Sequence, residues 1–233
     1  MCAKAVALAA RPEGMPKTSD FQIVDIESND PADGEIQVKN ICMSVDPYMR
    51  GRMVDRKSYV PPFQIGEPLT GGAIGKVIKS AHPDFKEGDF VSSHWGWRDG
   101  FTARAEGIER LGEIVAPASE YLGAIGMPGM TAYAGLLEVG ALKDGETVFV
   151  SGAAGAVGSI VGQIAKLKSC RVIGSAGNDE KVELLTKELG FDSAFNYNDG
   201  NLLGHLRELA PEGIDVYFDN VGAEHLEAAL MCM

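Results

Sequence analysis

Short apolar segments alternate with helical segments from residue 146 onward, and this alternation limits the possible folds more than any other feature of the chain. The segments lack the alternating polar residues of a half-buried strand, so each is expected to be buried on both faces. Helices of about 10 to 15 residues between them are typical of a parallel sheet with right-handed crossovers. The sequence therefore predicts a Rossmann-type, doubly wound α/β domain with strands within 146–150 (ETVFV), 171–177 (RVIGSAG), 193–197 (SAFNY) and 215–222 (DVYFDNVG).

The predicted sheet is short for a dinucleotide-binding domain. Four such strands are present, whereas a complete sheet of this kind has about six. The last residues, LEAALMCM at 226–233, still follow a helical pattern where the sequence stops. We therefore expect an incomplete Rossmann domain, in a chain that is either a whole protein or a fragment of a longer one.

The first half of the chain has a different texture. Short apolar runs cut by Gly, Pro and Asp predict a mainly β domain with irregular loops. Near residue 116 this pattern changes to helical segments over 116–140, which we expect to be broken at Pro128 and Gly129. We place the domain boundary between residues 118 and 119, giving domains at 1–118 and 119–233. The apolar runs lie at 35–45, 71–79, 89–97 and 108–111.

Composition excludes several classes of protein. A net charge of -12 argues against nucleic acid or an anionic membrane as partner. No apolar run approaches the roughly 20 residues that span a bilayer, and AVALAA at 5–10 is too short for a signal peptide, so a cytoplasmic location is expected. The cysteines lie far apart, which predicts reduced, mostly buried thiols in place of a disulfide framework or zinc knuckle: Cys2, Cys42, Cys170 and Cys232.

A turn of small residues follows the first predicted strand. The spacing G-x-G-x-x-G is met if Ala153 takes the first glycine position, with Gly155 and Gly158 in the second and third. Such a turn lets backbone approach a pyrophosphate and lets the following helix pack on the strand. Close strand-helix packing without a ligand would need the same small residues. Because the turn follows a strand and opens a helix within a βαβ unit, we favour a dinucleotide cofactor.

The end of the second predicted strand indicates which cofactor is bound. Sites for NAD usually place Asp or Glu there to hold the ribose 2'-hydroxyl, whereas this strand ends in Gly174–Ser175–Ala176–Gly177. Asp179 suits the first turn of the next helix. Lys181 can reach a 2'-phosphate, and the less favoured alternative is a solvated helix lysine. The sequence predicts NADP(H).

Several separated motifs resemble one family. GMPGMTAYAGL, AAGAVGS, GNDEK, FNY, YFDNVG and, most distinctively, ICMSVDPYMRGRM at 41–53 resemble the zinc-independent medium-chain dehydrogenase/reductases. The branch is that of prostaglandin and leukotriene reductases, 2-alkenal (double-bond) reductases and curcumin reductases. The resemblance implies a GroES-like β-barrel as catalytic domain, followed by the Rossmann domain. It also implies NADPH-dependent reduction of the carbon-carbon double bond of α,β-unsaturated ketones and aldehydes, and a homodimer if the protein is full length.

The resemblance also implies roles for particular residues. Gly177, Lys181 and Tyr197 would surround the 2'-phosphate, and Asn220 would lie along the cofactor. Pro47 and Tyr48 would lie near the nicotinamide, with Met130 and Thr131 as further cofactor neighbours. The pyrophosphate turn would be Gly152, Ala153, Ala154, Gly155, Ala156, Val157 and Gly158.

The expected chemistry needs a hydrogen-bond donor and no metal. Cys42 falls about where a catalytic zinc ligand of related dehydrogenases stands, but Gly66–Glu67–Pro68 replaces the segment that supplies their histidine. Zinc is therefore not expected. Negative charge that builds on the substrate carbonyl oxygen calls for a hydroxyl donor, for which Tyr48 is our first candidate and Tyr59 our second; either could instead be a packing or surface residue. A quinone reductase, a non-catalytic NADPH-binding module and an inactive fragment remain alternative functions.

Overall fold

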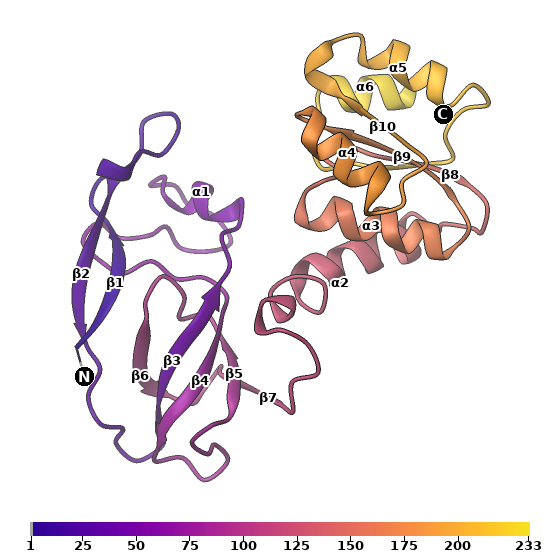
Figure 1. Ribbon diagram of the computed structural model, residues 1–233. Coiled ribbons are helices and arrows are strands. Elements are labelled where there is room, and N and C mark those ends of the chain that lie inside the picture. The colour runs from indigo at the N-terminus through magenta and orange to yellow at the C-terminus, as the bar shows by residue number, and fades with distance from the viewer. Residues whose placement is uncertain (1) are drawn as a thin grey trace. The chain divides into compact units, whose positions relative to one another are not determined.

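A computed structural model describes residues 2–233 as two compact units, which we treat separately (Figure 1). The first unit ends at Leu122 and the second comprises Gly123–Met233. The domain roles that the sequence attaches to 1–118 and 119–233 stay predictions. No helix of the described residues is long and apolar enough to cross a membrane.

The second unit contains a four-stranded parallel sheet in the order β10-β9-β8-β11. The first strand in sequence therefore lies between the second and the fourth, as in the mononucleotide-binding half of a Rossmann sheet. This confirms the doubly wound α/β fold predicted from the apolar segments. The strands are β8 (Thr147–Val150), β9 (Arg171–Ala176), β10 (Ser193–Asn196) and β11 (Val216–Phe218).

Both faces of this sheet are covered by helices, which explains why the strands lack polar alternation. Val148 and Val150 point into one apolar cluster with α3, and Phe149, between them, points into a second cluster with α5 and α6. Figure 1 shows α3 and the pair α5 and α6 on opposite sides of the sheet. The strands are followed by the helices α3 (Ala156–Leu167), α4 (Asp179–Lys187), α5 (Leu202–Leu209) and α6 (Glu224–Leu230), with a short 3-10 turn, η4 (Tyr197–Asp199), after β10.

The helix break expected at Pro128 and Gly129 is wrong. Helix α2 (Met127–Tyr133) runs through both residues and continues into a π-helical turn, η3 (Ala134–Val139). Pro128 is the second helical residue, where the backbone N–H has no intrahelical partner to lose. Gly129 leaves room for the Ala124 carbonyl oxygen, which a Cβ at this position would strike. These residues therefore start the helix.

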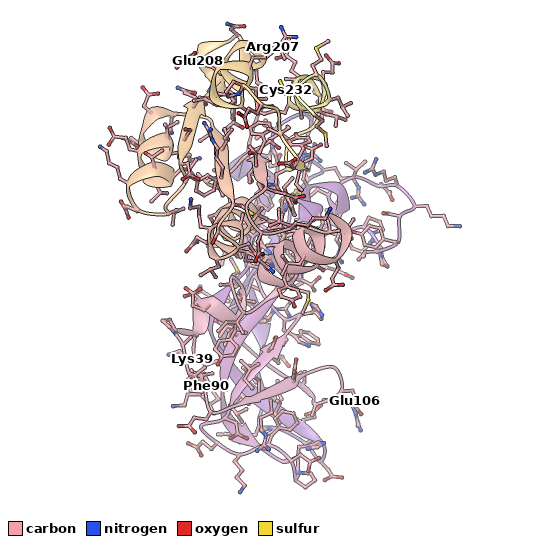
Figure 2. All side chains as sticks on the ribbon, turned by 90° about the vertical axis from the view of Figure 1, so that its right-hand side faces the viewer. Lys39, Phe90, Glu106, Arg207, Glu208 and Cys232 are labelled. Atoms are coloured by element: carbon pink, nitrogen blue, oxygen red, sulfur yellow. The ribbon has the colours of Figure 1, made fainter. Side chains whose placement is uncertain are left out.

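The first unit is built from antiparallel strands, as the sequence predicts. A two-stranded sheet pairs β1 with β2, and a five-stranded sheet has the order β6-β3-β4-β5-β7. Figure 2 labels Lys39 of β3 and Phe90 of β5, which both pair with Lys76 of β4 between them. The strands are β1 (Cys2–Leu8), β2 (Phe21–Glu27), β3 (Glu35–Met43), β4 (Ala73–Ser80), β5 (Phe90–Ser93), β6 (Gly100–Arg104) and β7 (Glu109–Gly112), with helical turns η1 (Thr18–Asp20), α1 (Tyr48–Arg52) and η2 (Ala118–Tyr121).

The four thiols differ in burial, so the prediction that they are mostly buried is only half right. Cys170 and Cys232, the latter labelled in Figure 2, are buried in the second unit. Cys42 is partly exposed on β3, and Cys2 is exposed on β1, where Ala3 and Ala5 are the inward-facing neighbours. All four are free cysteines.

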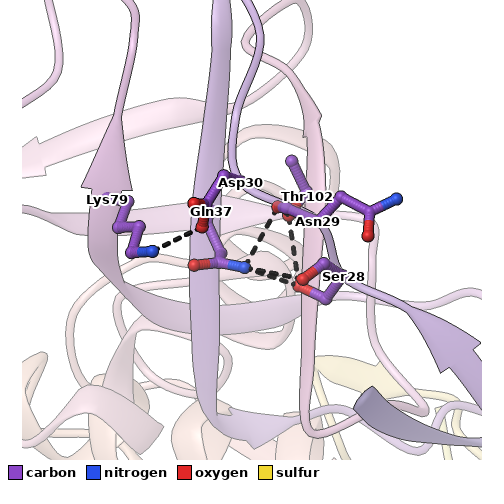
Figure 3. Close-up of polar contacts among 6 residues, drawn as sticks. All are labelled: Ser28, Asn29, Asp30, Gln37, Lys79 and Thr102. Atoms are coloured by element: carbon purple, nitrogen blue, oxygen red, sulfur yellow. Dashed lines mark hydrogen bonds and ion pairs between the residues drawn. The ribbon is translucent and has the colours of Figure 1, made fainter. Parts of the chain in front are cut away.

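A buried amide ties the segment after β2 to the five-stranded sheet (Figure 3). Gln37 of β3 is 3% exposed, and its Nε2 donates to the Ser28 carbonyl at 2.9 Å and to the Asn29 carbonyl at 3.2 Å. The Thr102 hydroxyl of β6 donates to the same Asn29 carbonyl at 2.6 Å. These bonds satisfy backbone acceptors that the sheet ladders do not reach.

Replacing this amide tests its contribution to stability. We expect Gln37→Leu to lower the free energy of unfolding by about 1–3 kcal/mol, because it removes the hydrogen bonds that a buried side-chain amide donates to the Ser28 and Asn29 carbonyls. Urea denaturation followed by circular dichroism measures the loss. Lys79→Ala, which removes only the exposed ion pair with Asp30, is the control and should cost clearly less; equal losses would contradict the role of the amide.

Candidate functional site

The glycine turn leaves the carboxyl end of β8 and lies beside the carboxyl end of β9. Gly152 has φ +57°, a left-handed conformation that favours glycine. The buried Ala153 follows, and its backbone N–H donates to the Ser175 carbonyl at the end of β9 at 2.9 Å. The turn is therefore held to the sheet by backbone hydrogen bonds before the helix begins.

Helix α3 starts in this turn without a side-chain cap. Gly155 is the N-cap residue and supplies no side-chain hydrogen bond, so the first-turn N–H groups lack partners within the helix. Gly155 and Ala156 are exposed, while Ala154 and Val157 pack against the core. The turn therefore presents N–H donors and the positive end of a helix dipole to solvent, which suits an anion.

Gly158 sets how closely α3 approaches the turn. A Cβ at this position would stand 2.7 Å from the Gly152 carbonyl oxygen and 2.8 Å from the Ala153 Cα. Both are backbone atoms that cannot rotate away. The small residue here is required by packing alone, whatever the turn binds.

A carboxylate organises the loop after β11. The Asp219 carboxylate accepts hydrogen bonds from the Tyr217 hydroxyl at 2.7 Å, the Gly222 N–H at 2.7 Å and the Val221 N–H at 2.9 Å. Burial raises the pKa of Asp219, but these hydrogen bonds outweigh it and lower the pKa below its usual value. The pKa of Tyr217 is raised, mainly by burial and then by its hydrogen bond to the Asp219 carboxylate. Asp219 is thus an ionised anchor for the loop.

This loop meets the glycine turn through Asn220. Its side-chain amide donates to the Ser151 carbonyl and its backbone N–H to the Ser151 hydroxyl, both at 2.9 Å. A Cβ on Gly152 would contact Asn220 at 3.5 Å. The structure therefore places Asn220 beside the glycine turn, at the carboxyl ends of β8 and β11, where strand order reverses and doubly wound sheets bind ligands.

Sequence reasoning missed the residues that position Asn220. The fully buried Ser151 and the pair Tyr217 and Asp219 form a network across 68 positions of sequence, because β8 and β11 are neighbours only in the folded sheet. The only local sign of this network is that polar residues follow the apolar run VYF. The sequence does not show which residues they bond to.

The end of β9 carries the residues expected around a 2'-phosphate. Gly177 lies against the Tyr197 hydroxyl, which a Cβ at 177 would approach to 2.7 Å. Lys181 lies in the first turn of α4, its backbone N–H bound to the Asn178 side chain at 2.9 Å. Its side chain is exposed and takes no part in the ion pairs found among residues 2–233.

Asp179, the first carboxylate in sequence after this strand end, is already engaged. Asp179 accepts a hydrogen bond from the Asn196 side chain at 2.9 Å, from the end of β10. Asp179 also stands at the start of α4, where a carboxylate stabilises the helix dipole. The segment Gly174–Gly177 itself contains no Asp or Glu.

Two further predicted cofactor neighbours lie on the outside of α2. Met130 is 67% exposed and Thr131 is exposed as well, while the adjacent Ala132 is buried against the core that α3 shares. Helices α2 and α3 pack on one another. The role of Met130 and Thr131 toward a cofactor stays a prediction.

In the first unit, α1 presents a tyrosine to a hollow of about 740 Å³. Met49 and Met53, four residues apart, are buried in one apolar cluster and fix the helix. Tyr48, at the first position of the helix, is half-buried, and Pro47 is the N-cap residue. The hollow is lined by Pro47, Tyr48, Val54, Tyr59, Val60 and Pro62, with Gly51, Ser58 and three arginines.

The two candidate tyrosines line this hollow in different environments. Tyr59 is 87% exposed. Burial raises the pKa of Tyr48, Asp46 and Tyr59 raise it further, and Arg52 opposes them in part. The Tyr48 hydroxyl therefore stays protonated at neutral pH and is available as a hydrogen-bond donor.

Burial also raises the pKa of the Cys42 thiol, although a backbone hydrogen bond from Ile74 opposes the rise. A neutral thiol behaves as a small apolar group. Among residues 2–233 there is no group of three or more His, Cys, Asp or Glu side chains placed to hold a metal ion.

Family models match both parts of the chain. One described as N-terminal domain of oxidoreductase matches residues 4–111, and one described as zinc-binding dehydrogenase matches residues 156–233. The 2-alkenal reductase (NADP(+)-dependent) of Nicotiana tabacum is 46% identical over 238 residues, which cover 99% of this chain and 69% of that protein. The chain belongs to the medium-chain dehydrogenase/reductases, in their zinc-independent branch.

Other members of the family show the same relationship. The putative NADP-dependent oxidoreductase YfmJ of Bacillus subtilis is 48% identical over 226 residues, covering 97% of this chain and 66% of its own length. The crystal structure of CurA from Vibrio vulnificus in complex with NADPH has a TM-score of 0.92 and 41% identity, covering 99% of this chain and 68% of that one. The chain thus spans about two thirds of the length of the relatives it matches. These matches confirm the family, with its GroES-like and Rossmann-type domains, that the motifs predicted.

The packing role of Gly158 can be separated from that of Gly155. We expect Gly158→Ala to lower the free energy of unfolding by about 1–3 kcal/mol, because the methyl group meets backbone atoms that cannot move aside. Gly155→Ala is the matched control: its φ of -78° suits alanine, and its closest contact is 3.2 Å. Urea denaturation should show a clearly smaller loss for Gly155→Ala; equal losses would contradict this distinction.

Proposed function

We propose that the protein is an NADPH-dependent oxidoreductase that reduces the carbon-carbon double bond of α,β-unsaturated ketones and aldehydes. The observation that carries the proposal is the uncapped start of α3 beside the Asn220 loop, together with a β9 end, Gly174–Gly177, that contains no Asp or Glu and is followed by Lys181, which forms no ion pair among residues 2–233. Two similar proteins support it: one is named as an NADP-dependent 2-alkenal reductase, and the other, CurA, has a crystal structure in complex with NADPH.

The residues present fit a dinucleotide. The first-turn N–H groups of α3 would hold the pyrophosphate, and Gly155 keeps this surface free of a side chain. A Cβ at Gly155 would stand 3.2 Å from the Gly152 carbonyl oxygen, so even a methyl group narrows this cradle. Asn220, held by Ser151, would lie along the cofactor.

The selection of NADP(H) over NAD(H) would rest on the end of β9. Lys181 would pair with the 2'-phosphate, with Gly177 and Tyr197 shaping the site. Asp179 already accepts from Asn196 and is less available to a ribose hydroxyl. A phosphate dianion there would also meet the N-terminus of α4.

Cofactor selection is tested by titration. We expect the wild-type protein to bind NADPH more tightly than NADH, and Lys181→Ala to weaken NADPH binding about tenfold while leaving NADH binding unchanged, because it removes a charged hydrogen bond. Quenching of protein fluorescence measures both. A wild-type preference for NADH, or an unchanged affinity of the variant for NADPH, would contradict the assignment. Lys187→Ala, whose lysine pairs with Glu183, is the control.

In the first unit, Tyr48 is the proposed hydrogen-bond donor to the substrate. NADPH, when bound, would supply a hydride to the β-carbon of an enone. The Tyr48 hydroxyl would donate to the carbonyl oxygen, where negative charge grows, and so favour the enolate. A donor or water would then give the α-carbon the proton that completes the saturated product. Its raised pKa keeps the proton on Tyr48 until that oxygen becomes basic. Tyr59, exposed at the same hollow, would be a second donor or a wall residue.

Removing one hydroxyl tests this role. We expect Tyr48→Phe to lower kcat/KM for a small enone about 10²-fold, as loss of an oxyanion-type donor does, whereas Tyr59→Phe should lower it much less. Steady-state oxidation of NADPH provides the measurement, on enones and quinones in parallel. A change below about threefold for Tyr48→Phe would remove it as the key donor, and turnover of quinones alone would favour the quinone reductase.

Several properties of the complete protein are proposals as well. A cytoplasmic location, a homodimer and catalysis without a metal come from the sequence and the resemblance. A non-catalytic NADPH-binding module is the remaining alternative, and absence of turnover with intact NADPH binding would favour it.

A further inference from the structure

One buried side chain joins the loop after β11 to the turn after β10. His225, in the first turn of α6, is 5% exposed. Its ring meets the Tyr197 ring edge-on, with the ring centres 5.1 Å apart and the ring planes at 81°. Tyr197 begins η4, directly after β10. The contact therefore links two loops that leave different parallel strands at the same edge of the sheet.

The Tyr197 hydroxyl stands at the end of β9. A Cβ on Gly177 would lie 2.7 Å from this oxygen. The side-chain amide of Asn198 donates to the Gly177 carbonyl, also at 2.7 Å, and so holds η4 against the strand end. The Tyr197 hydroxyl itself forms no hydrogen bond with any of residues 2–233, so it is free to bind a ligand.

Without a hydrogen bond to fix it, the Tyr197 side chain takes its position from packing. The ring lies at the margin of the apolar cluster that contains Phe149 and Phe195. Its one contact with another aromatic ring among residues 2–233 is the contact with His225. Edge-on contacts between rings are directional and add to the effect of burial. His225 therefore limits where the Tyr197 hydroxyl can stand.

His225 is itself held from two sides. Its backbone N–H donates to the Gly222 carbonyl at 3.1 Å, and the Gly222 N–H donates to the Asp219 carboxylate at 2.7 Å. The His225 ring also lies within 9° of parallel to the fully buried Phe149 of β8, with the ring centres 6.5 Å apart. The loop that positions Asn220 thus positions His225 as well.

The imidazole of His225 acts as a neutral ring. Its Nε2 is buried, and no hydrogen bond joins the ring to any of residues 2–233. Burial lowers the pKa of His225, although the Asp219 and Glu224 carboxylates oppose this. A buried charge without a partner is costly, so His225 contributes the shape of its ring and no charge. A phenyl ring would serve the same purpose, whereas an aliphatic side chain would not.

We propose that His225 is a positioning residue for NADPH: its ring sets the Tyr197 hydroxyl at the end of β9, where that hydroxyl donates to the 2'-phosphate. The inference rests on the proposed function, which places the 2'-phosphate beside Gly177, Lys181 and Tyr197. Lys181 supplies the positive charge there, and His225 orients the second donor. NADH has no 2'-phosphate, so its binding does not depend on His225.

Two fragments of the cofactor test this without any turnover. The probes are adenosine 2',5'-bisphosphate, which carries the 2'-phosphate, and 5'-AMP, which lacks it, each titrated in a calorimeter. We expect His225→Leu to weaken binding of the bisphosphate about fivefold, because the aromatic contact that orders Tyr197 is lost. Binding of 5'-AMP should be unchanged, and His225→Phe should keep the wild-type affinity for both.

A double-mutant cycle shows whether His225 acts through Tyr197. Tyr197→Phe removes the hydroxyl, and in that background His225→Leu should weaken binding of the bisphosphate no further. His205→Leu is the matched control, because His205 stacks on Phe195 at 5.2 Å and has no ring contact with Tyr197. It should leave both affinities unchanged.

Several results would overturn the proposal. They are an unchanged affinity of His225→Leu for the bisphosphate, equal weakening of both nucleotides, and a full effect of His225→Leu in the Tyr197→Phe background. Loss of the bisphosphate preference in His225→Phe would assign a polar role to the imidazole and overturn it too. If His225→Leu does not fold, His225→Met gives the same comparison with a more adaptable side chain.

Failure of the proposed function gives a different pattern. Wild-type protein that prefers the bisphosphate but reduces no enone would contradict the proposed reaction, while the titrations still decide the role of His225. Equal binding of the bisphosphate and 5'-AMP by the wild-type protein would contradict the 2'-phosphate site itself, and the positioning role with it.

Discussion

The second unit depends on one close contact, the packing of α3 against the turn that leaves β8. Gly158 allows the helix to approach within van der Waals distance of the Gly152 carbonyl and the Ala153 Cα. This approach fixes the direction of α3, and hence where its unpaired first-turn N–H groups point. The hydrogen bond from Ala153 to Ser175 brings the end of β9 to the same edge. Packing and anion binding therefore require the same small residues.

A second constraint acts across the strand-order reversal. Asp219 holds the loop after β11 through the N–H groups of Val221 and Gly222, and Asn220 bonds to Ser151 at the end of β8. The two loops thereby become one rigid edge. A cofactor lying there would meet surfaces that need no rearrangement, which favours binding because less ordering remains to be done.

The sequence predicted the second unit well because its strands are buried on both faces. Val148 and Phe149 are both apolar although they point to opposite sides of the sheet, and that run is visible without a structure. The break predicted at Pro128 and Gly129 was wrong because both residues stand in the first turn of α2, where proline costs no helical hydrogen bond. The Asp219 network depends on neighbours distant in sequence, which no local pattern encodes.

In the proposed reaction the carbon-carbon double bond, and not the carbonyl group, receives the hydride. Reduction of an enone with NADPH that carries deuterium at nicotinamide C4, followed by nuclear magnetic resonance of the product, tests it most directly. We predict a saturated ketone with deuterium on the β-carbon. Deuterium on the carbinol carbon of an allylic alcohol would contradict the account.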